Sequence, residues 1–460
     1  MKKVEGKKVL VVGLARSGVA ACYLLLRQGA RVIATDAKQL SEVPGAQALS
    51  NEGIKLALGG HPISLLNGTD LIILSPGVPV DIPLLTAARK RGIPIISEVE
   101  LAYHFCSAPI IAITGANGKT TTTSWVGEML KAGGKDVVVA GNIGTPLSTV
   151  VKGLTPEQLL VAELSSFQLE GTKDFRPWMA AVLNITADHL DRHGSFTAYV
   201  RAKGKIFANQ QAEDYSIFNA ADPHAVQLAG STSGEIYWFN AQGKVEKGAY
   251  LDAGQLVIGE PSGAHIELCS IEELSLPGKH NLENGLAAAL IAYLAGISPQ
   301  TIREVLTKFA GVEHRCERVD EINGITFVND SKGTNPEAAI VAIHAFSQPI
   351  VLIAGGRGKG ADFNIFAQEI VERVKAVVLL GEAAPEIKQS LAAKGYDRIV
   401  EVASLAEAVR KAYALARVGD CVLLSPACAS WDMFNNFEER GRVFKETVAQ
   451  LRREIDEEGP

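Results

Sequence analysis

The chain lacks paired cysteines and long apolar runs. Its six cysteines are scattered and form no C-x-x-C pair, which favours reduced, buried thiols of a cytosolic protein over a disulfide framework. No uninterrupted apolar run approaches the roughly 20 residues that a membrane span needs, and the first residues, MKKVEGKK, lead into a strand rather than an apolar signal core. We therefore expect a cytoplasmic protein without membrane insertion.

An excess of basic charge is also missing. The formal net charge is −6, and no basic stripe runs along the chain, so we expect no nucleic-acid partner. The 47% hydrophobic and 21% charged content describes a globular protein with sizeable cores. The 460 residues suffice for about three domains.

Apolar, β-rich runs alternate with helix-like stretches along the chain, which is typical of doubly wound α/β domains. We expect a Rossmann-like domain over residues 1–108, a central domain over 109–311 and a second Rossmann-like domain over 312–460. The central domain should have a mostly parallel sheet with helices on both faces. Its glycine-rich part, about 215–275, predicts an additional small β sheet.

The most informative motif reads TGANGKT at residues 114–120 and follows the apolar run 109–113. Binding a nucleoside triphosphate requires this order: the glycines admit phosphate to backbone N–H groups, Lys119 supplies a charge, and Thr120 can hold Mg²⁺. Ile113 stands where the standard loop has its first glycine. The motif predicts that the central domain resembles a phosphate-loop ATPase. An ordinary glycine turn with a solvated lysine is the alternative interpretation, because the first glycine is missing.

The first domain opens with VVGLARSG at 11–18, and Asp36 ends its second strand. This resembles the dinucleotide-binding fingerprint, in which a helix N-terminus receives a pyrophosphate and an acid binds a ribose. Ala15 replaces the middle glycine. A nicotinamide dinucleotide, a uridine-diphosphate sugar and a tight turn without ligand all remain open.

Two polar stretches follow predicted strands of the central domain. Glu163 ends the run 159–163, where a carboxylate facing a phosphate loop is expected to hold Mg²⁺; a helix-capping or solvated carboxylate is the alternative. Residues 184–193, NITADHLDRH, gather Asp, His and Arg, and a polar surface loop explains them equally well. Lys203 and Lys205 follow on a predicted helix, where lysines are normally solvated.

The third domain carries three polar stretches after or between predicted strands. They read VNDSKGTNP at 328–336, GGRGKG at 355–360 and SPACASWD at 425–432, the last followed by FEERG at 437–441. Together they suggest a site for a small anionic substrate, whereas each alone could be a glycine-rich surface turn.

The combination of these segments with GNIG at 141–144 and ELSSFQLE at 163–170 resembles the Mur ligases. These are ATP-dependent amino-acid ligases of peptidoglycan precursor synthesis. Within the family, the NDSKGTN and SPACAS segments favour the members that add D-glutamate to UDP-N-acetylmuramoyl-L-alanine, and the Asp-rich loop of the diaminopimelate- or lysine-adding members is absent.

The resemblance implies that ATP phosphorylates the alanyl carboxylate and that the amine of D-glutamate displaces phosphate from the acyl phosphate. ATP and Mg²⁺ are the expected cofactors, and a monomer is expected. Catalytic positions by resemblance are Lys119, Glu163, His189, Lys203 and Arg315. Metal ligands would be Thr120, Glu163, His189 and Lys203, the last as a carbamate, which turns a cation into an anionic oxygen ligand.

The resemblance assigns the substrates residue by residue. The ATP positions are Gly115, Asn117, Gly118, Lys119, Thr120, Thr121, Asn284, Arg315, Asp330 and Lys332. The UDP-substrate positions are Arg16, Ser17, Asp36, Ser75, Gly77, Asn142 and His189. The D-glutamate positions are Thr334, Lys359, Ser430 and Phe437. Arg16 and Gly360 depart from residues found in some family members.

Two alternatives remain. One is a related Mur or folylpolyglutamate-type ligase that adds another amino acid. The other is an NAD-dependent oxidoreductase or a nucleotide-sugar binding module, although an oxidoreductase would not need Lys119, Glu163 and Arg315 together.

Overall fold

The structure is a computed structural model that describes residues 4–43, 45–142, 144–186, 190–260, 262–276, 278–358 and 360–458. It divides into two compact units, Met1–Leu274 with Lys279–Phe309 and Ser275–Gly278 with Ala310–Pro460. Unit 1 contains two sheets and unit 2 contains one. Among the described residues, no helix combines the length and apolar character needed to cross a membrane.

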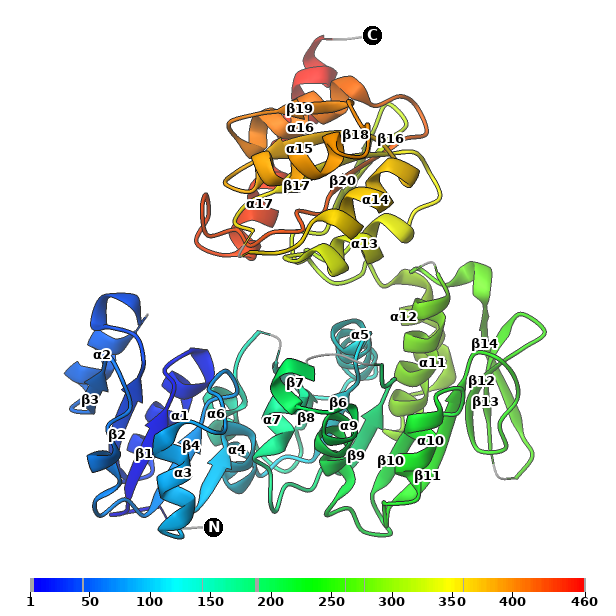
Figure 1. Ribbon diagram of the computed structural model, residues 1–460. Helices are drawn as coiled ribbons and strands as arrows, with labels where there is room; N and C mark the ends of the chain where they lie inside the picture. Colours follow the sequence, from blue (N-terminus) through cyan, green and yellow to red (C-terminus); the bar gives the residue numbers. More distant parts are fainter. Residues whose placement is uncertain are drawn as a thin grey trace. The chain divides into compact units, whose positions relative to one another are not determined.

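The first sheet has five parallel strands in the order β3-β2-β1-β4-β5 (Figure 1). They are β1 (Lys8–Val12), β2 (Arg31–Asp36), β3 (Lys55–Leu58), β4 (Leu71–Leu74) and β5 (Ile95–Ser97). The accompanying helices are α1 (Arg16–Arg27), α2 (Ala46–Asn51), α3 (Pro83–Lys90) and α4 (Glu98–Phe105). Val9 and Val11 pack into one core and Leu10 and Val12 into another, so β1 is buried on both faces.

The second sheet has nine strands in the order β14-β13-β12-β11-β10-β9-β6-β8-β7. They are β6 (Ile110–Thr114), β7 (Val137–Gly141), β8 (Leu159–Glu163), β9 (Met179–Val182), β10 (Tyr215–Asn219), β11 (Glu235–Asn240), β12 (Gly248–Asp252), β13 (Gln255–Gly259) and β14 (His265–Ser270). Its helices are α5 (Lys119–Ala132), α6 (Leu147–Val150), α7 (Ser166–Glu170), α8 (Leu190–His193), α9 (Phe196–Gly204), α10 (Pro223–Ala229), α11 (Lys279–Leu294) and α12 (Pro299–Lys308).

The glycine-rich segment expected to form a small sheet instead continues the nine-stranded sheet. Strands β10, β11 and β12 extend it in parallel, and only β13 and β14 are antiparallel. Gly248, with φ +143°, lets β12 approach β11, since a Cβ there would lie 1.7 Å from the Trp238 carbonyl oxygen. Without a side chain at this position, the meander can join the edge of the larger sheet.

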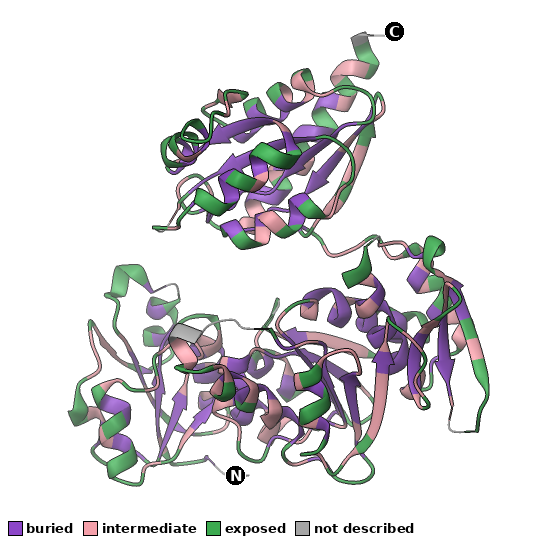
Figure 2. Ribbon diagram, turned by 45° about the vertical axis from the view of Figure 1, so that its right-hand side comes forward, coloured by how far each residue is buried: buried purple, intermediate pink, exposed green. Residues whose placement is uncertain are grey.

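Helix α5 carries the predicted phosphate loop at its start and packs against β6, β7 and β8 as well as α11 and α12. Its Trp125 ring lies 5.3 Å from that of Phe309. The burial colouring in Figure 2 shows the sheet strands largely buried and the outward helix faces exposed. The helices therefore cover the central strands, and the glycine-rich loops follow the carboxyl ends of these strands, where ligands bind in open α/β sheets.

Unit 2 has a six-stranded sheet in the order β15-β16-β20-β17-β18-β19, in which only β15 is antiparallel to its neighbour. Its strands are β15 (Glu317–Ile322), β16 (Ile325–Asn329), β17 (Ile350–Gly355), β18 (Val374–Leu380), β19 (Ile399–Glu401) and β20 (Cys421–Leu424). Its helices are α13 (Pro336–His344), α14 (Asn364–Arg373), α15 (Ala384–Ala392), α16 (Leu405–Leu415) and α17 (Phe437–Glu458). The expected α/β class is confirmed for all three sheets, while the exact domain bounds remain predictions.

Candidate active site

The phosphate loop joins the end of β6 to the start of α5. Gly118 occupies the N-cap position with φ +81°, and no side chain caps the helix. The N–H groups of the first turn are thus left for an anion, and the helix dipole places partial positive charge beside them. Thr120 and Thr121 are buried in this turn. This loop has the backbone that phosphate binding requires, although its first glycine is missing.

Two asparagines from other elements brace the loop. Asn184, after β9, accepts a hydrogen bond from the Asn117 N–H at 2.8 Å and donates to the Asn117 carbonyl oxygen at 3.1 Å. Buried Asn284 of α11 accepts from the Thr122 hydroxyl at 3.3 Å. A Cβ on Gly118 would lie 2.1 Å from Asn284 Oδ1. Glycine is therefore required both for the backbone angle and for the approach of α11.

Two lysines donate to the same carbonyl group of the loop. Lys119 Nζ lies 3.0 Å from the Gly115 oxygen and 2.7 Å from the Ala116 oxygen. Lys203 Nζ, from α9, lies 2.7 Å from the Gly115 oxygen and 4.7 Å from the centre of the Tyr199 ring. Lys203 is 2% exposed, so it is not solvated as lysines on a surface helix normally are. The structure places both predicted lysines at the phosphate loop.

Glu163 ends β8, directly beside β6, where its backbone pairs with Ile113. Its Oε1 accepts a hydrogen bond from Asn142 Nδ2 at 2.8 Å. Its Oε2 is buried and has no hydrogen-bond partner among the described residues. A buried carboxylate oxygen left unpaired is costly, and a hard cation such as Mg²⁺ would satisfy it. The donor set of Glu163 and Thr120 thus fits Mg²⁺.

The first sheet gathers five of the seven predicted UDP-substrate residues at the carboxyl ends of β1, β2 and β4, whereas Asn142 follows β7 and His189 lies outside the described residues. Both carboxylate oxygens of Asp36 accept backbone hydrogen bonds, from Leu14 at 2.6 Å and Lys38 at 2.9 Å. Exposed Arg16 donates to the Gly144 carbonyl oxygen of the central domain at 3.3 Å. Asp36 therefore braces the turn before α1, and Arg16 links the two sheets of unit 1.

The other three UDP-substrate candidates of the first sheet surround the same turn. Ser17 lies in the first turn of α1, and Gly77 is exposed in the loop after β4. Ser75 is buried, and its hydroxyl has no hydrogen-bond partner within the described part of the chain. A polar ligand at this switch point between β1 and β4 would find an available hydroxyl.

Unit 2 brings the NDSKGTN and SPACAS segments together at the ends of β16 and β20. Asp330 accepts a hydrogen bond from the Ser425 hydroxyl at 2.7 Å and from the Cys316 N–H at 3.2 Å. Burial raises the pKa of Asp330 to about 6, although the bond from Ser425 and the charge of Arg315 act against this rise. Lys332 Nζ lies 5.7 Å from the centre of the Phe437 ring.

Arg440, which the sequence analysis did not single out as a site residue, holds these segments in place. It is 3% exposed and donates from Nε to the Ser331 hydroxyl, from Nη2 to the Ser331 carbonyl and from Nη1 to the Cys428 carbonyl, at 2.9 to 3.1 Å. Burial lowers the pKa of Arg440 to about 10. Its place in the FEERG segment was the available signal.

The remaining D-glutamate candidates lie around the Arg440 network. Thr334 follows the NDSK turn, where its N–H donates to the Lys332 carbonyl at 2.9 Å. Ser430 is buried, and Phe437 begins α17. Two predicted site residues, His189 and Lys359, lie outside the described residues.

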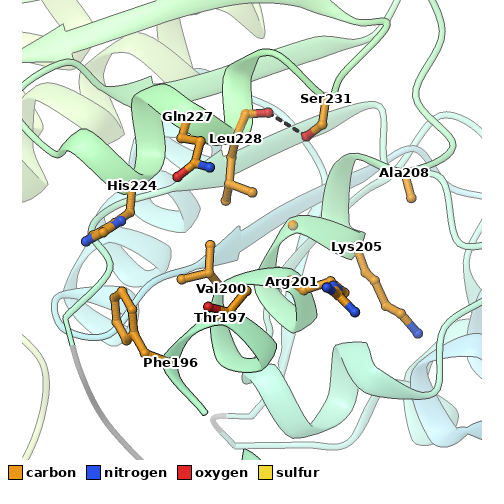
Figure 3. A pocket seen from close by; sticks show the side chains of 11 residues that line it. Phe196, Thr197, Val200, Arg201, Lys205, Ala208, His224, Gln227, Leu228 and Ser231 are labelled. Carbon is orange, nitrogen blue, oxygen red and sulfur yellow. Dashed lines mark hydrogen bonds between the residues drawn. The ribbon is translucent and has the colours of Figure 1, made fainter.

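A cavity of about 540 Å³ lies between α9 and α10 (Figure 3). In this view Phe196, Val200, His224 and Leu228 of the two helices line its middle and one end, with Arg201 and Lys205 at the other end. None of the predicted site residues lines it. The candidate active site is therefore defined by the strand ends and the phosphate loop, not by this cavity.

The fold and this site define a multidomain α/β protein with a phosphate-binding loop. Three family models match the chain: "Mur ligase MurD-like, N-terminal domain" over residues 7–97, "Mur ligase middle domain" over 113–292 and "Mur ligase, glutamate ligase domain" over 314–428. The chain belongs to the Mur ligase family, which confirms the resemblance drawn from its motifs.

Relatives match the chain from end to end. The UDP-N-acetylmuramoylalanine--D-glutamate ligase of Thermoanaerobacter sp. (strain X514) is 48% identical over 98% of this chain and 100% of its own length. The enzyme of the same name from Clostridioides difficile is 43% identical over 98% of this chain and 100% of its own length. The one from Bacillus mycoides is 46% identical over 97% and 98%.

Solved structures share the fold at lower identity. UDP-N-acetylmuramate-alanine ligase from Thermotoga maritima superimposes with a TM-score of 0.58 at 21% identity, covering 97% of this chain and 99% of that one. MurF ligase from the same organism, in complex with ADP, gives 0.56 at 16% identity, covering 98% and 97%. These likenesses support the three-sheet architecture alone.

Proposed function

We propose that the chain is an ATP-dependent ligase that joins D-glutamate to UDP-N-acetylmuramoyl-L-alanine in peptidoglycan precursor synthesis, giving ADP and phosphate. The observation that carries this proposal is the 48% identity, over the full length of the relative, to a ligase of that name. The phosphate loop and the strand-end carboxylate supply the groups that the reaction requires.

The reaction proceeds in two steps. The alanyl carboxylate attacks the γ-phosphorus of ATP and releases ADP, which gives an acyl phosphate. The amine of D-glutamate then attacks the acyl carbon, loses a proton and expels phosphate. Phosphoryl transfer depends mainly on positioning and on neutralising charge. The first turn of α5 and Lys119 would bind the phosphates, and Arg315 would stabilise charge on the transferred group.

Lys119 must leave its present partners to reach a phosphate. Its ammonium donates to two carbonyl oxygens of its own loop, at 2.7 and 3.0 Å. A phosphate is a stronger acceptor because it is charged, so ATP would draw the ammonium away. Thr121, Asn117 and Asn284 would complete the loop around ATP.

For Mg²⁺, Glu163 and Thr120 would be the ligands within the described residues, with Lys203 as a carbamate and His189 as further ligands. When bound, Mg²⁺ would neutralise phosphate charge. Asn142 would orient Glu163, because it already donates to Oε1 and leaves Oε2 for the cation. Asn142 would also contact the UDP-substrate at the edge of β7.

Each of the three domains would bind one substrate. Residues 1–108 would bind the uridine diphosphate, residues 109–311 would bind ATP, and residues 312–460 would bind D-glutamate. Asp330 and Lys332 would add contacts to the nucleotide from the third domain. Thr334, Lys359, Ser430 and Phe437 would receive D-glutamate, and the protein would act as a cytoplasmic monomer.

The decisive experiment measures phosphate release with ATP, UDP-N-acetylmuramoyl-L-alanine and one amino acid at a time. D-Glutamate should support turnover, whereas L-glutamate, L-lysine and meso-diaminopimelate should not. Turnover with another of these amino acids, but not with D-glutamate, would overturn the proposal. Oxidation of NADH without ATP consumption would favour the oxidoreductase alternative.

The carbamate on Lys203 has its own test. A Lys203→Ala variant should lose activity, and wild-type activity should rise with added bicarbonate. A Lys203→Ala variant that is fully active, together with a wild type that does not respond to bicarbonate, would remove the carbamate from the proposal while leaving D-glutamate ligation intact.

A further inference from the structure

His193 connects two helices that carry or follow the candidate metal ligands. Its Nε2 lies 2.9 Å from the Ser166 hydroxyl oxygen, and its Nδ1 lies 3.0 Å from Glu170 Oε1. Ser166 and Glu170 are the first and last residues of α7, whereas His193 precedes α9 in the chain. The His193 side chain is 1% exposed. Both ring nitrogens are therefore engaged by one short helix, away from water.

Two aromatic rings also contact the His193 ring. The Phe167 ring stacks on His193 at 5.2 Å with an interplanar angle of 13°, and the Tyr199 ring of α9 meets it edge-on at 5.3 Å. The Tyr199 ring also lies 4.7 Å from Lys203 Nζ, which donates to the Gly115 carbonyl. A continuous set of contacts thus runs from α7 through His193 and Tyr199 to the phosphate loop.

Helix α7 follows Glu163 closely. Only Leu164 and Ser165 separate them, and Ser165 forms a capping box with Gln168 that fixes the start of the helix. A shift of α7 would therefore move Glu163, and a shift of α9 would move Lys203. Metal affinity responds to groups that orient the ligands from behind, typically by about 10- to 100-fold.

We propose that His193 is a positioning residue, which holds α7 against α9 and so keeps Glu163 and Lys203 at the spacing that a divalent cation requires. This inference rests on the proposed function, because it takes these two residues as metal ligands. His193 itself touches neither substrate nor metal. It acts through the two bonds to α7 and the contact with Tyr199.

The alternative is that the His193 ring only fills space in the core, and the two roles predict different behaviour of a variant. His193→Phe keeps a planar ring against Phe167 and Tyr199 but removes both bonds to α7. If the ring only filled the core, this variant would behave as the wild type. If its nitrogens fix the two helices, metal binding must weaken although the core stays filled. Ser166→Ala removes one of the two bonds with a much smaller change of volume.

His224→Phe is the matched control. His224 belongs to α10 and lines the cavity in Figure 3, and its ring meets that of Phe196 edge-on at 4.8 Å. It thus packs on an aromatic ring of α9, as His193 does, but it belongs to α10, whereas His193 ends α8 and bonds to Ser166 and Glu170 of α7. Its replacement should leave divalent-cation affinity unchanged.

The test titrates the full-length protein with Mn²⁺ alone and follows free Mn²⁺ by electron paramagnetic resonance. His193→Phe should weaken Mn²⁺ binding by about 10-fold or more, and Ser166→Ala should weaken it by a smaller factor. The KM for D-glutamate should stay within twofold of the wild type. Thermal unfolding of each variant checks that the fold is retained.

Mn²⁺ affinities within twofold of the wild type in the variants that fold, or no measurable Mn²⁺ site in the wild type, would overturn the proposal. If His193→Phe does not fold, Ser166→Ala decides between the outcomes. Failure of the proposed function would show separately, as an absence of phosphate release from the wild type with D-glutamate, because Mn²⁺ binding requires neither amino acid nor ATP.

Discussion

Asn142 donates a hydrogen bond to Oε1 of Glu163 at 2.8 Å, while Oε2 of the same carboxylate is buried without a hydrogen-bond partner in the described structure. The hydrogen bond from the Asn142 amide holds the carboxylate by Oε1 and leaves Oε2 available. This arrangement suits a group that must present one anionic oxygen to a cation.

Glu163→Gln should reduce kcat by roughly 100-fold or more, because a neutral amide cannot hold Mg²⁺ as a carboxylate does and metal neutralisation supplies several kcal/mol to the transition state. Steady-state phosphate release at saturating ATP measures the effect. Glu157→Gln is the control, since Glu157 is exposed and distant from the strand end. Equal activities of the two variants would remove Glu163 from the metal site.

Gly118→Ala should abolish ATP binding and lower the melting temperature. A left-handed backbone costs an L-residue about 1–2 kcal/mol, and the new methyl group would displace Asn284 from its bond to Thr122. Gly134→Ala separates the two causes, because Gly134 has φ +77° and no atom within 4 Å of its Cβ position. Calorimetry with and without ATP measures both effects, and equal melting temperatures would refute the clash.

Arg440→Met should raise the KM for D-glutamate while changing stability little. Three acceptors lose their donor, at about 1 kcal/mol of net contribution each. Relief of the buried charge, whose pKa burial lowers to about 10, offsets about 3 kcal/mol. The loops that carry Thr334 and Ser430 would then lose their common anchor, so binding suffers more than folding.

Arg410→Met provides the comparison for Arg440→Met. Arg410 pairs with Glu454 on the surface, and such exposed pairs contribute about 0–1 kcal/mol. Neither the melting temperature nor the KM should change appreciably. A large loss of stability in Arg440→Met with unchanged kinetics would show that the guanidinium serves folding rather than the D-glutamate site.

Asp330→Asn should change how stability depends on pH. The folded-state pKa of Asp330 is raised from 3.8 to about 6, so the folded chain holds this proton more tightly than the unfolded chain. The stability that Asp330 contributes is full below pH 4 and is lost as pH rises through about 6. The variant should therefore gain stability relative to the wild type between these values and keep a constant difference above pH 7.

Urea unfolding at pH 4 to 8 measures this difference. Exposed Asp397 offers the control, and Asp397→Asn should follow the wild type throughout. A parallel pH dependence for wild type and Asp330→Asn would contradict the assigned shift, since the difference between the two curves isolates the one carboxyl group.

Much of the architecture could be predicted from local patterns. Strands such as β8 and β17 are short, continuous apolar runs between polar loops, which is typical of parallel strands buried on both faces. The place of the meander could not be predicted, because its attachment to the nine-stranded sheet depends on the contact between Gly248 and Trp238, ten residues apart in the chain. Registration at a sheet edge is decided by the neighbouring strand.

Part of the candidate site could likewise be predicted from local patterns, and part depends on contacts between distant segments. The phosphate loop can be predicted from local sequence, since glycine, lysine and threonine at fixed spacing already specify the backbone and charge near a helix N-terminus. The family can be predicted in the same way, through motifs spread over the whole chain. Three relationships become visible only in the folded chain: Lys203 is buried against Gly115, Asn142 orients Glu163, and Arg440 joins two distant loops. These relationships depend on burial and on contacts between distant segments, which no local pattern encodes.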